Sequence, residues 1–186
     1  MTEDSEHLTA GDVPPGCGVY YARSSAPGVL LRLLVSLIDV AVMLLVMILC
    51  ATVGRHVARD WFPAYVAAVA LVQWAYMVPL KNSRLGTAGY ALFRLKVVNL
   101  RGQKPSVLRM TFRLMAGVAI NPFFDVIWSA SDDSHQAMRD KLSGTYVVRR
   151  RCLPVGTGAI VKARLFLLML PLLYREVARG PEATQV

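Results

Sequence analysis

The chain has 186 residues, of which 55% are hydrophobic, and it carries a net charge of +9 at pH 7. This composition is too apolar for an ordinary small soluble domain, and the length leaves room for about two to four membrane segments. Because the basic residues flank apolar stretches, they indicate membrane orientation and contact with the lipid bilayer and its anionic headgroups. Nucleic-acid binding is excluded as the main function.

Residues 1–26 begin with an acidic stretch and continue into Pro14-Pro15-Gly16. They lack the basic start and the early apolar core of a secretory signal peptide. We therefore expect residues 1–26 to form a disordered cytoplasmic tail.

Two apolar spans follow, at about 28–53 and 64–80, joined by a short polar link with Trp61 at its end. A helix needs about 20 apolar residues to cross a bilayer, and tryptophan is enriched at the membrane surface. The two spans predict a transmembrane helical hairpin.

The loop over 81–106 contains six basic residues and no acidic residue. By the positive-inside rule this loop is cytoplasmic, and so is the N-terminus of the chain. These observations predict a multi-pass protein of a bacterial-type cytoplasmic (inner) membrane. Within the cytoplasmic part, 96–100 and 144–150 have strand character, and we expect them to pair as a small β-hairpin-like cap.

A third apolar region, 107–129, is interrupted by Asn121-Pro122. A single crossing would place the basic cluster at 139–151 outside, against the charge bias, and proline disrupts a helix. The pattern favours two half-helices that enter the membrane and return, with a single span as the alternative.

The last apolar segment, about 155–177, contains Lys162 and Arg164. Its length and flanking charges favour an interfacial helix, although a full crossing with snorkelling basic side chains is the alternative. The fold class predicted from all segments is an all-α integral membrane protein with a small cytoplasmic cap.

Arg32 and Asp39 lie within the first span and are seven residues apart, or about 10.5 Å along a helix. This separation is too long for a direct ion pair. Arg32 can reach the membrane interface, whereas Asp39 lies too deep and needs a partner inside the protein. Antiparallel packing of the hairpin places Tyr76 or Gln73 nearest to Asp39.

Two further donors for Asp39 are Arg109 and Arg113, which share one face of the third apolar region. Asp125, beside the break in that region, is either a second acid of the same polar network or an exposed interfacial acid. For Asp39 itself, a structural role in fixing the helices is favoured over a proton or cation site.

Evidence for an enzyme is weak, and we expect no catalytic residues, metal or cofactor. Ser134, His135 and Asp140 resemble a triad but share one short stretch with no oxyanion motif. Gly86 and Gly89 could indicate a phosphate loop, but a helix start or tight turn explains them better. The three cysteines are too far apart in sequence to indicate a disulfide framework or a metal site.

Several short motifs follow one another in a fixed order along the chain. They are Arg32, Asp39, Gly86-Thr87-Ala88-Gly89, Leu95-Lys96-Val97-Val98-Asn99, Gly102 and the segment from Asp140 to Val148. Together they resemble the RDD family of small integral membrane proteins. The similarity runs over about 27–150, which predicts a membrane domain there and a C-terminal extension over 151–186. It implies that Arg32, Asp39 and Asp140 are the naming residues.

Two positions depart from the family pattern: Tyr90 stands where lysine is common, and Arg139 where histidine often precedes the second aspartate. A proton relay through that histidine is therefore in question for this chain. Members of the family have been linked to cation/proton exchange and to membrane-protein complexes. We expect a non-catalytic accessory or scaffold subunit that associates with other membrane proteins or as a homo-oligomer. The alternative is an oligomeric cation/proton antiporter or small-solute transporter.

Overall fold

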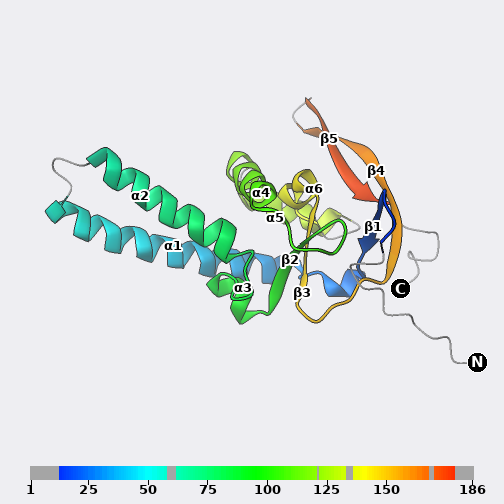
Figure 1. Cartoon of the computed structure of the whole chain (residues 1–186), viewed down its shortest axis with the longest axis horizontal. Coiled ribbons are helices and arrows are strands. Elements are labelled where there is room, and N and C mark those ends of the chain that lie inside the picture. The colour runs from blue at the N-terminus through cyan, green and yellow to red at the C-terminus, as the bar shows by residue number, and fades with distance from the viewer. Residues whose placement is uncertain (1–12, 58–61, 121, 133–135, 168–169, 179–186) are drawn as a thin grey trace, which may run out of the picture.

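A computed structural model describes residues 13–57, 62–120, 122–132, 136–167 and 170–178. Two long helices project as a hairpin from a more compact end that holds the remaining elements (Figure 1). We call this compact end, residues 13–27 and 81–178, the cap. The helices and turns are η1 (Arg23–Ser25), α1 (Val29–Val57), α2 (Phe62–Ala75), η2 (Tyr76–Leu80), α3 (Ala88–Leu92), α4 (Val107–Ala119), α5 (Pro122–Ser131) and α6 (Met138–Ser143). The strands are β1 (Cys17–Tyr20), β2 (Leu95–Asn99), β3 (Thr145–Arg149), β4 (Gly156–Leu167) and β5 (Leu170–Val177).

The hairpin consists of α1 and α2, and each of these helices overlaps a helical stretch that is, by length and composition, apolar enough to cross a membrane. These stretches are 23–52, with mean hydropathy 2.9, and 62–80, with mean hydropathy 1.4. Many of their leucines are exposed, for example Leu37 and Leu71, as expected of side chains that face lipid. The last turn of the second stretch is a π-helix containing Pro79, because proline cannot donate the regular helical hydrogen bond.

The third apolar region is divided into α4 and α5 by the predicted break, since α4 ends at Ala119 and α5 begins at Pro122. It is therefore not one continuous helix. Asn121 lies outside the described residues.

The predicted pairing of the two short cap strands is confirmed. β2 and β3 are antiparallel, with Leu95 opposite Arg149 and Asn99 opposite Thr145. No tight turn connects these two strands, since α4, α5 and α6 lie between them in the chain. The two strands thus join the start and the end of the helical part of the cap.

The predicted all-α fold is wrong, because six α-helices and two β-sheets occur among the described residues. The C-terminal segment is an antiparallel hairpin, β4–β5, rather than a helix. Side chains from Gly156 to Val161 and from Pro171 to Tyr174 alternate between exposed and half-buried, the period of two typical of a strand. Counting apolar length alone missed this period.

The predicted disordered tail is also wrong for the described part of 13–26. Here β1 pairs with β4, with Cys17 opposite Ala159 and Tyr20 opposite Gly156. The result is a three-stranded sheet in the order β1-β4-β5. Residues 1–12 lie outside the described residues.

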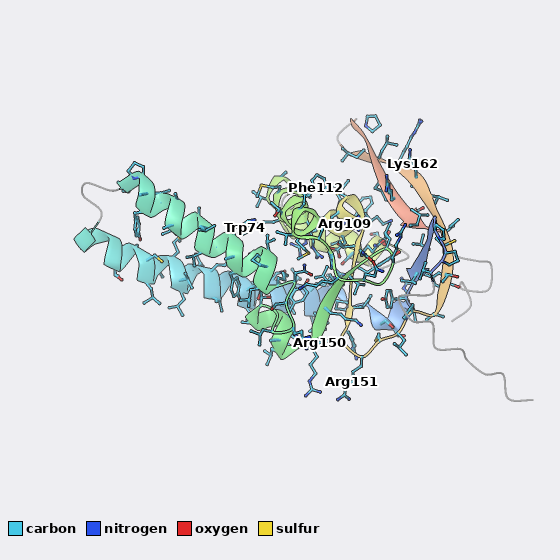
Figure 2. All side chains as sticks on the ribbon, viewed as in Figure 1. Trp74, Arg109, Phe112, Arg150, Arg151 and Lys162 are labelled. Carbon is cyan, nitrogen blue, oxygen red and sulfur yellow. The ribbon has the colours of Figure 1, made fainter. Side chains whose placement is uncertain are left out.

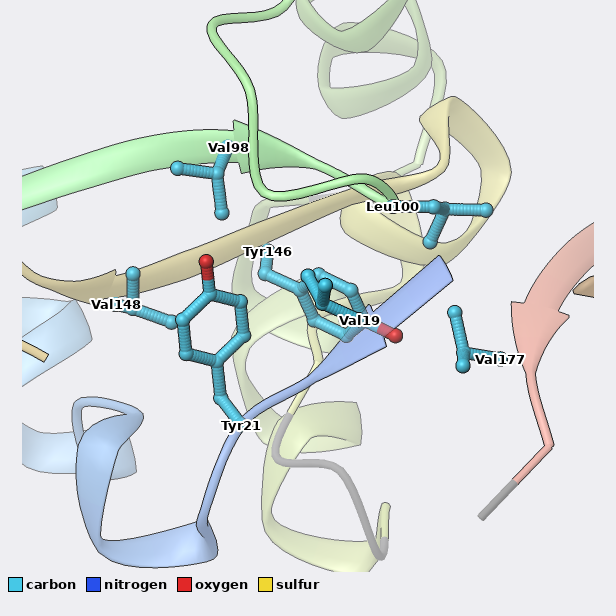
Figure 3. Close-up of a cluster of buried hydrophobic side chains, with 7 residues drawn as sticks. All are labelled: Val19, Tyr21, Val98, Leu100, Tyr146, Val148 and Val177. Atoms are coloured by element: carbon cyan, nitrogen blue, oxygen red, sulfur yellow. The ribbon is translucent and has the colours of Figure 1, made fainter. Parts of the chain in front are cut away.

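One buried cluster packs the two sheets together (Figure 3). It consists of Val19, Tyr21, Val98, Leu100, Tyr146, Val148 and Val177. A second cluster packs the helices against the other face of the β2–β3 sheet. It consists of Val35, Val78, Tyr90, Leu95, Val97, Met110 and Val147. Because successive residues of a strand point to opposite faces, β2 and β3 supply both clusters. The β2–β3 sheet is therefore the central layer of the cap.

Candidate functional site

Asp39 is fully buried in α1 (1% exposed) and accepts hydrogen bonds from several groups. The Thr87 hydroxyl donates at 2.8 Å and the Gly89 backbone N–H at 3.0 Å. The Tyr76 hydroxyl lies 3.3 Å away, and the Lys81 ammonium forms an ion pair at 3.2 Å. A buried carboxylate needs such compensation, because an unpaired charge in this position would be costly.

The predicted contact of Asp39 with Tyr76 is present, whereas Gln73 is not among its partners. Lys81 was not predicted as a partner of Asp39, because it was counted only among the basic residues of the loop over 81–106. Nor was it predicted that Thr87 and Gly89 face back toward the first span. The signals were available: Lys81 is the first basic residue after the second span, and the Gly-Thr-Ala-Gly motif follows shortly.

The Gly-Thr-Ala-Gly motif forms a turn and the start of α3, as the structural interpretation predicted. Gly86 has φ +78°, a conformation that favours glycine. A side chain at Gly89 would lie 2.6 Å from the Val35 carbonyl oxygen. The Gly89 N–H binds the Asp39 carboxylate and not a phosphate.

Asp140, with no exposed area, is the second acidic centre. Arg32 reaches one carboxylate oxygen at 2.9 Å and Arg113 reaches the other at 2.6 Å. Burial acts to raise the pKa of Asp140, but the positive charges of Arg113 and Arg32 outweigh it and hold the pKa below its usual value.

This arrangement shows partners that the sequence did not predict. Arg32 is 5% exposed, and its guanidinium pairs with Asp140 within the protein. Arg113 pairs with Asp140 and not with Asp39. As the spacing predicted, Arg32 and Asp39 have separate partners.

Asp125 is a further buried acid, and it belongs to a polar network rather than to an exposed surface. The Arg139 backbone N–H donates to it at 2.7 Å, and the Arg139 side chain forms an ion pair at 3.0 Å. Burial raises the pKa of Asp125 in spite of Arg139. We call these three acids and their basic partners the buried network: Asp39, Asp125, Asp140, Lys81, Arg32, Arg113 and Arg139.

Tyr90 lies between the first two centres. The Lys81 ammonium is 4.3 Å from the centre of its ring, a cation–π contact. Burial acts to raise the pKa of Tyr90, but the charges of Lys81 and Arg113 outweigh it and lower the pKa. Tyr90, one of the two residues that depart from the family pattern, thus connects the Asp39 and Asp140 parts of the buried network.

The other candidate residues lie apart from the buried network or outside the described residues. Ser134 and His135 lie outside the described residues, and Asp140 is occupied by two arginines. Arg109 lies in the wall of a separate cavity in the cap. The described part of the chain contains no group of three residues that could hold a metal ion. Its three cysteines are unpaired.

Two helices that are long and apolar enough to cross a membrane, tied by buried ion pairs to a small mixed α/β cap, are typical of a small membrane protein. The RDD family model matches residues 26–144, and the chain belongs to this family. No curated protein and no solved structure is significantly similar to the chain.

Proposed function

We propose that this chain is a non-catalytic subunit or scaffold of a membrane complex. In this role the buried network holds the hairpin to the cap, and the exposed apolar faces of the hairpin contact other membrane proteins or other copies. The observation that supports this proposal most directly is the set of buried ion pairs between acidic and basic side chains. Each buried acid of the network pairs with a basic side chain from a different helix or loop.

The pairs connect elements that are far apart in the chain. Arg32 of α1 binds Asp140 of α6, and Arg113 of α4 binds the same carboxylate. Asp39 of α1 binds the segment that follows η2 and the start of α3. A buried charge that loses its partner is strongly destabilising, so such pairs favour one arrangement of the hairpin on the cap.

The space around the network favours this structural role over ion exchange. A cavity beside Arg32, lined also by Gln136 and Tyr146, has a volume of about 10 Å³, which is room for about one water molecule. An exchange site needs a carboxylate that can release its partner and meet a hydrated ion. Asp39 instead uses its oxygens on Thr87, Gly89, Tyr76 and Lys81.

The test compares wild type with Asp39→Asn in proteoliposomes that carry a pH gradient. We expect no Na⁺- or K⁺-dependent proton flux above that of empty liposomes. In native membranes we expect wild type in a complex larger than the 20.5 kDa monomer, and a loss of that complex in Asp39→Asn. Cation-dependent flux that the folded Asp39→Asn protein lacks would overturn the proposal in favour of an antiporter.

A further inference from the structure

An open cavity of about 440 Å³ lies in the cap and shares no lining residue with the buried network. Its walls come from the turn after β2, the first turn of α4, the end of α6 and the β4–β5 hairpin. Three arginines line it, namely Arg101, Arg109 and Arg175, and no described acidic residue does. It is thus a concave site with charge of one sign, which concentrates anions.

These arginines differ from those of the buried network, each of which pairs with an aspartate. Within the described part of the chain, Arg101, Arg109 and Arg175 have no side-chain hydrogen bond or ion pair. Glu176, the next residue along β5, does not line the cavity and interacts electrostatically with Lys141. Three guanidinium groups without a counter-charge are suited to an anion, and the planar fork of arginine matches phosphate oxygens.

The helix that carries Arg109 also exposes an apolar stripe. Leu108, Phe112, Met115 and Val118 are 81%, 53%, 53% and 70% exposed, and their spacing places them on one side of α4. Figure 2 shows Phe112 and Arg109 on this helix, with Arg109 nearer to the β4–β5 hairpin. The stripe and the cavity therefore share the first turn of α4.

The stripe lies at the level where the hairpin enters the cap. The Trp74 indole N–H, near the end of α2, donates to the Thr111 hydroxyl of α4 at 3.2 Å. Tryptophan is typical of the membrane surface, and an amphipathic helix at that level lies with its apolar side in lipid. An anionic lipid would then meet Arg109 with its headgroup and the α4 stripe with its acyl chains.

We propose that the arginine-lined cavity binds a phosphate group, presented by the headgroup of an anionic phospholipid. Arg101, Arg109 and Arg175 would hold the phosphate oxygens, and the Leu108–Val118 stripe would contact the acyl chains. A soluble phosphorylated compound shares the headgroup chemistry but makes no use of the stripe. This proposal does not depend on the scaffold function, because its binding readout is independent of ion flux and of complex formation.

The test uses the full-length protein in detergent and two probes. Native mass spectrometry measures retention of dioleoyl phosphatidylglycerol against dioleoyl phosphatidylcholine, and titration calorimetry measures binding of pyrophosphate. The cavity variant is Arg101→Gln/Arg109→Gln/Arg175→Gln. The control variant, Arg84→Gln/Arg149→Gln/Arg151→Gln, removes the same charge from exposed positions outside the cavity.

We expect wild type and the control variant to retain phosphatidylglycerol, and the cavity variant to bind it about tenfold or more weakly. Pyrophosphate binding that is lost in the cavity variant, with lipid retention unchanged, would overturn the lipid assignment and identify a soluble ligand. Equal losses in the two variants, or no binding to wild type, would overturn the site. If the triple variant does not fold, the exposed single variants Arg101→Gln and Arg175→Gln are compared in the same way.

Discussion

Asp140 is a single residue on which two buried cations depend. Arg32 and Arg113 approach different oxygens of its carboxylate, and all three side chains are at most 5% exposed. Removing the acid therefore has a different effect on the buried charge than removing one of the arginines. Losing one arginine leaves a neutral pair, whereas losing the acid leaves two buried cations without a counter-charge.

We expect Asp140→Asn to lower the free energy of unfolding by about 3–5 kcal/mol, because uncompensated buried charges are costly. Thermal unfolding of the purified protein in detergent measures this loss. The control is Arg151→Gln, which changes an exposed charge of the cap and should alter stability by less than about 0.5 kcal/mol. A similar effect of the two substitutions would contradict a stabilising role of this centre.

The same centre predicts a loss of stability in acid. Burial alone would raise the pKa of Asp140, but Arg113 and Arg32 hold it below its usual value, so the unfolded state binds the proton more tightly. This contribution is complete above the pKa of an unfolded aspartate, about 4, and is lost as the pH falls through the lower native value. Arg32→Gln should move this loss to higher pH. Acid unfolding curves that coincide for wild type and Arg32→Gln would contradict the assignment.

At the scale of elements, α1 and α3 pack closely against each other. Gly89 of α3 lies against the backbone of Val35 and beside the Asp39 carboxylate, and it also donates its N–H to that carboxylate. The start of the five-residue helix α3 is thus held against α1 by the hydrogen bond from Gly89 to Asp39. This contact explains why a small residue is required at that position.

We expect Gly89→Ala to destabilise the protein by about 1–3 kcal/mol, because the new methyl group would overlap the Val35 carbonyl oxygen and push α3 away. Gly28→Ala is the matched control, since nothing lies within 4 Å of the added carbon. Unfolding in detergent compares the two. An undisturbed Gly89→Ala protein would show that α1 and α3 are not in close contact.

At the scale of the whole molecule, α1 and α2 project from the same side of the cap (Figure 1). Cys17 lies in β1 and Cys152 follows β3, so both belong to the cap. If the hairpin crosses the membrane, these two cysteines must face the same side. The basic loop over 81–106 predicts that this side is the cytoplasm.

A membrane-impermeant maleimide tests this arrangement in cells that express variants with one cysteine. Cys17 and Cys152 should react after permeabilisation and not before it. Asp60→Cys, in the link between the two helices, should react in intact cells. Labelling of Cys17 and Cys152 from opposite sides would contradict the described fold.

Much of the fold could be predicted from local patterns in the sequence. The apolar runs predicted the hairpin, Pro122 predicted the division of the third region, and β-branched runs predicted the pairing of β2 with β3. The β4–β5 hairpin did not follow, because a short apolar run is compatible with a helix or a strand. In this chain β4 is stabilised as a strand by its pairing with β1, which lies more than a hundred residues earlier.

For the site, residue types and depth were sufficient to show that Asp39 needs a donor inside the protein, because an unpaired carboxylate is costly in an apolar span. They also placed Tyr76 within reach. Which cation meets which acid depended on the tertiary structure: α6 carries Asp140 to Arg32, which is 108 residues away, and α4 carries Arg113 to the same point. Local periodicity describes neighbours along the chain, whereas these pairs arise from packing of distant elements around the β2–β3 sheet.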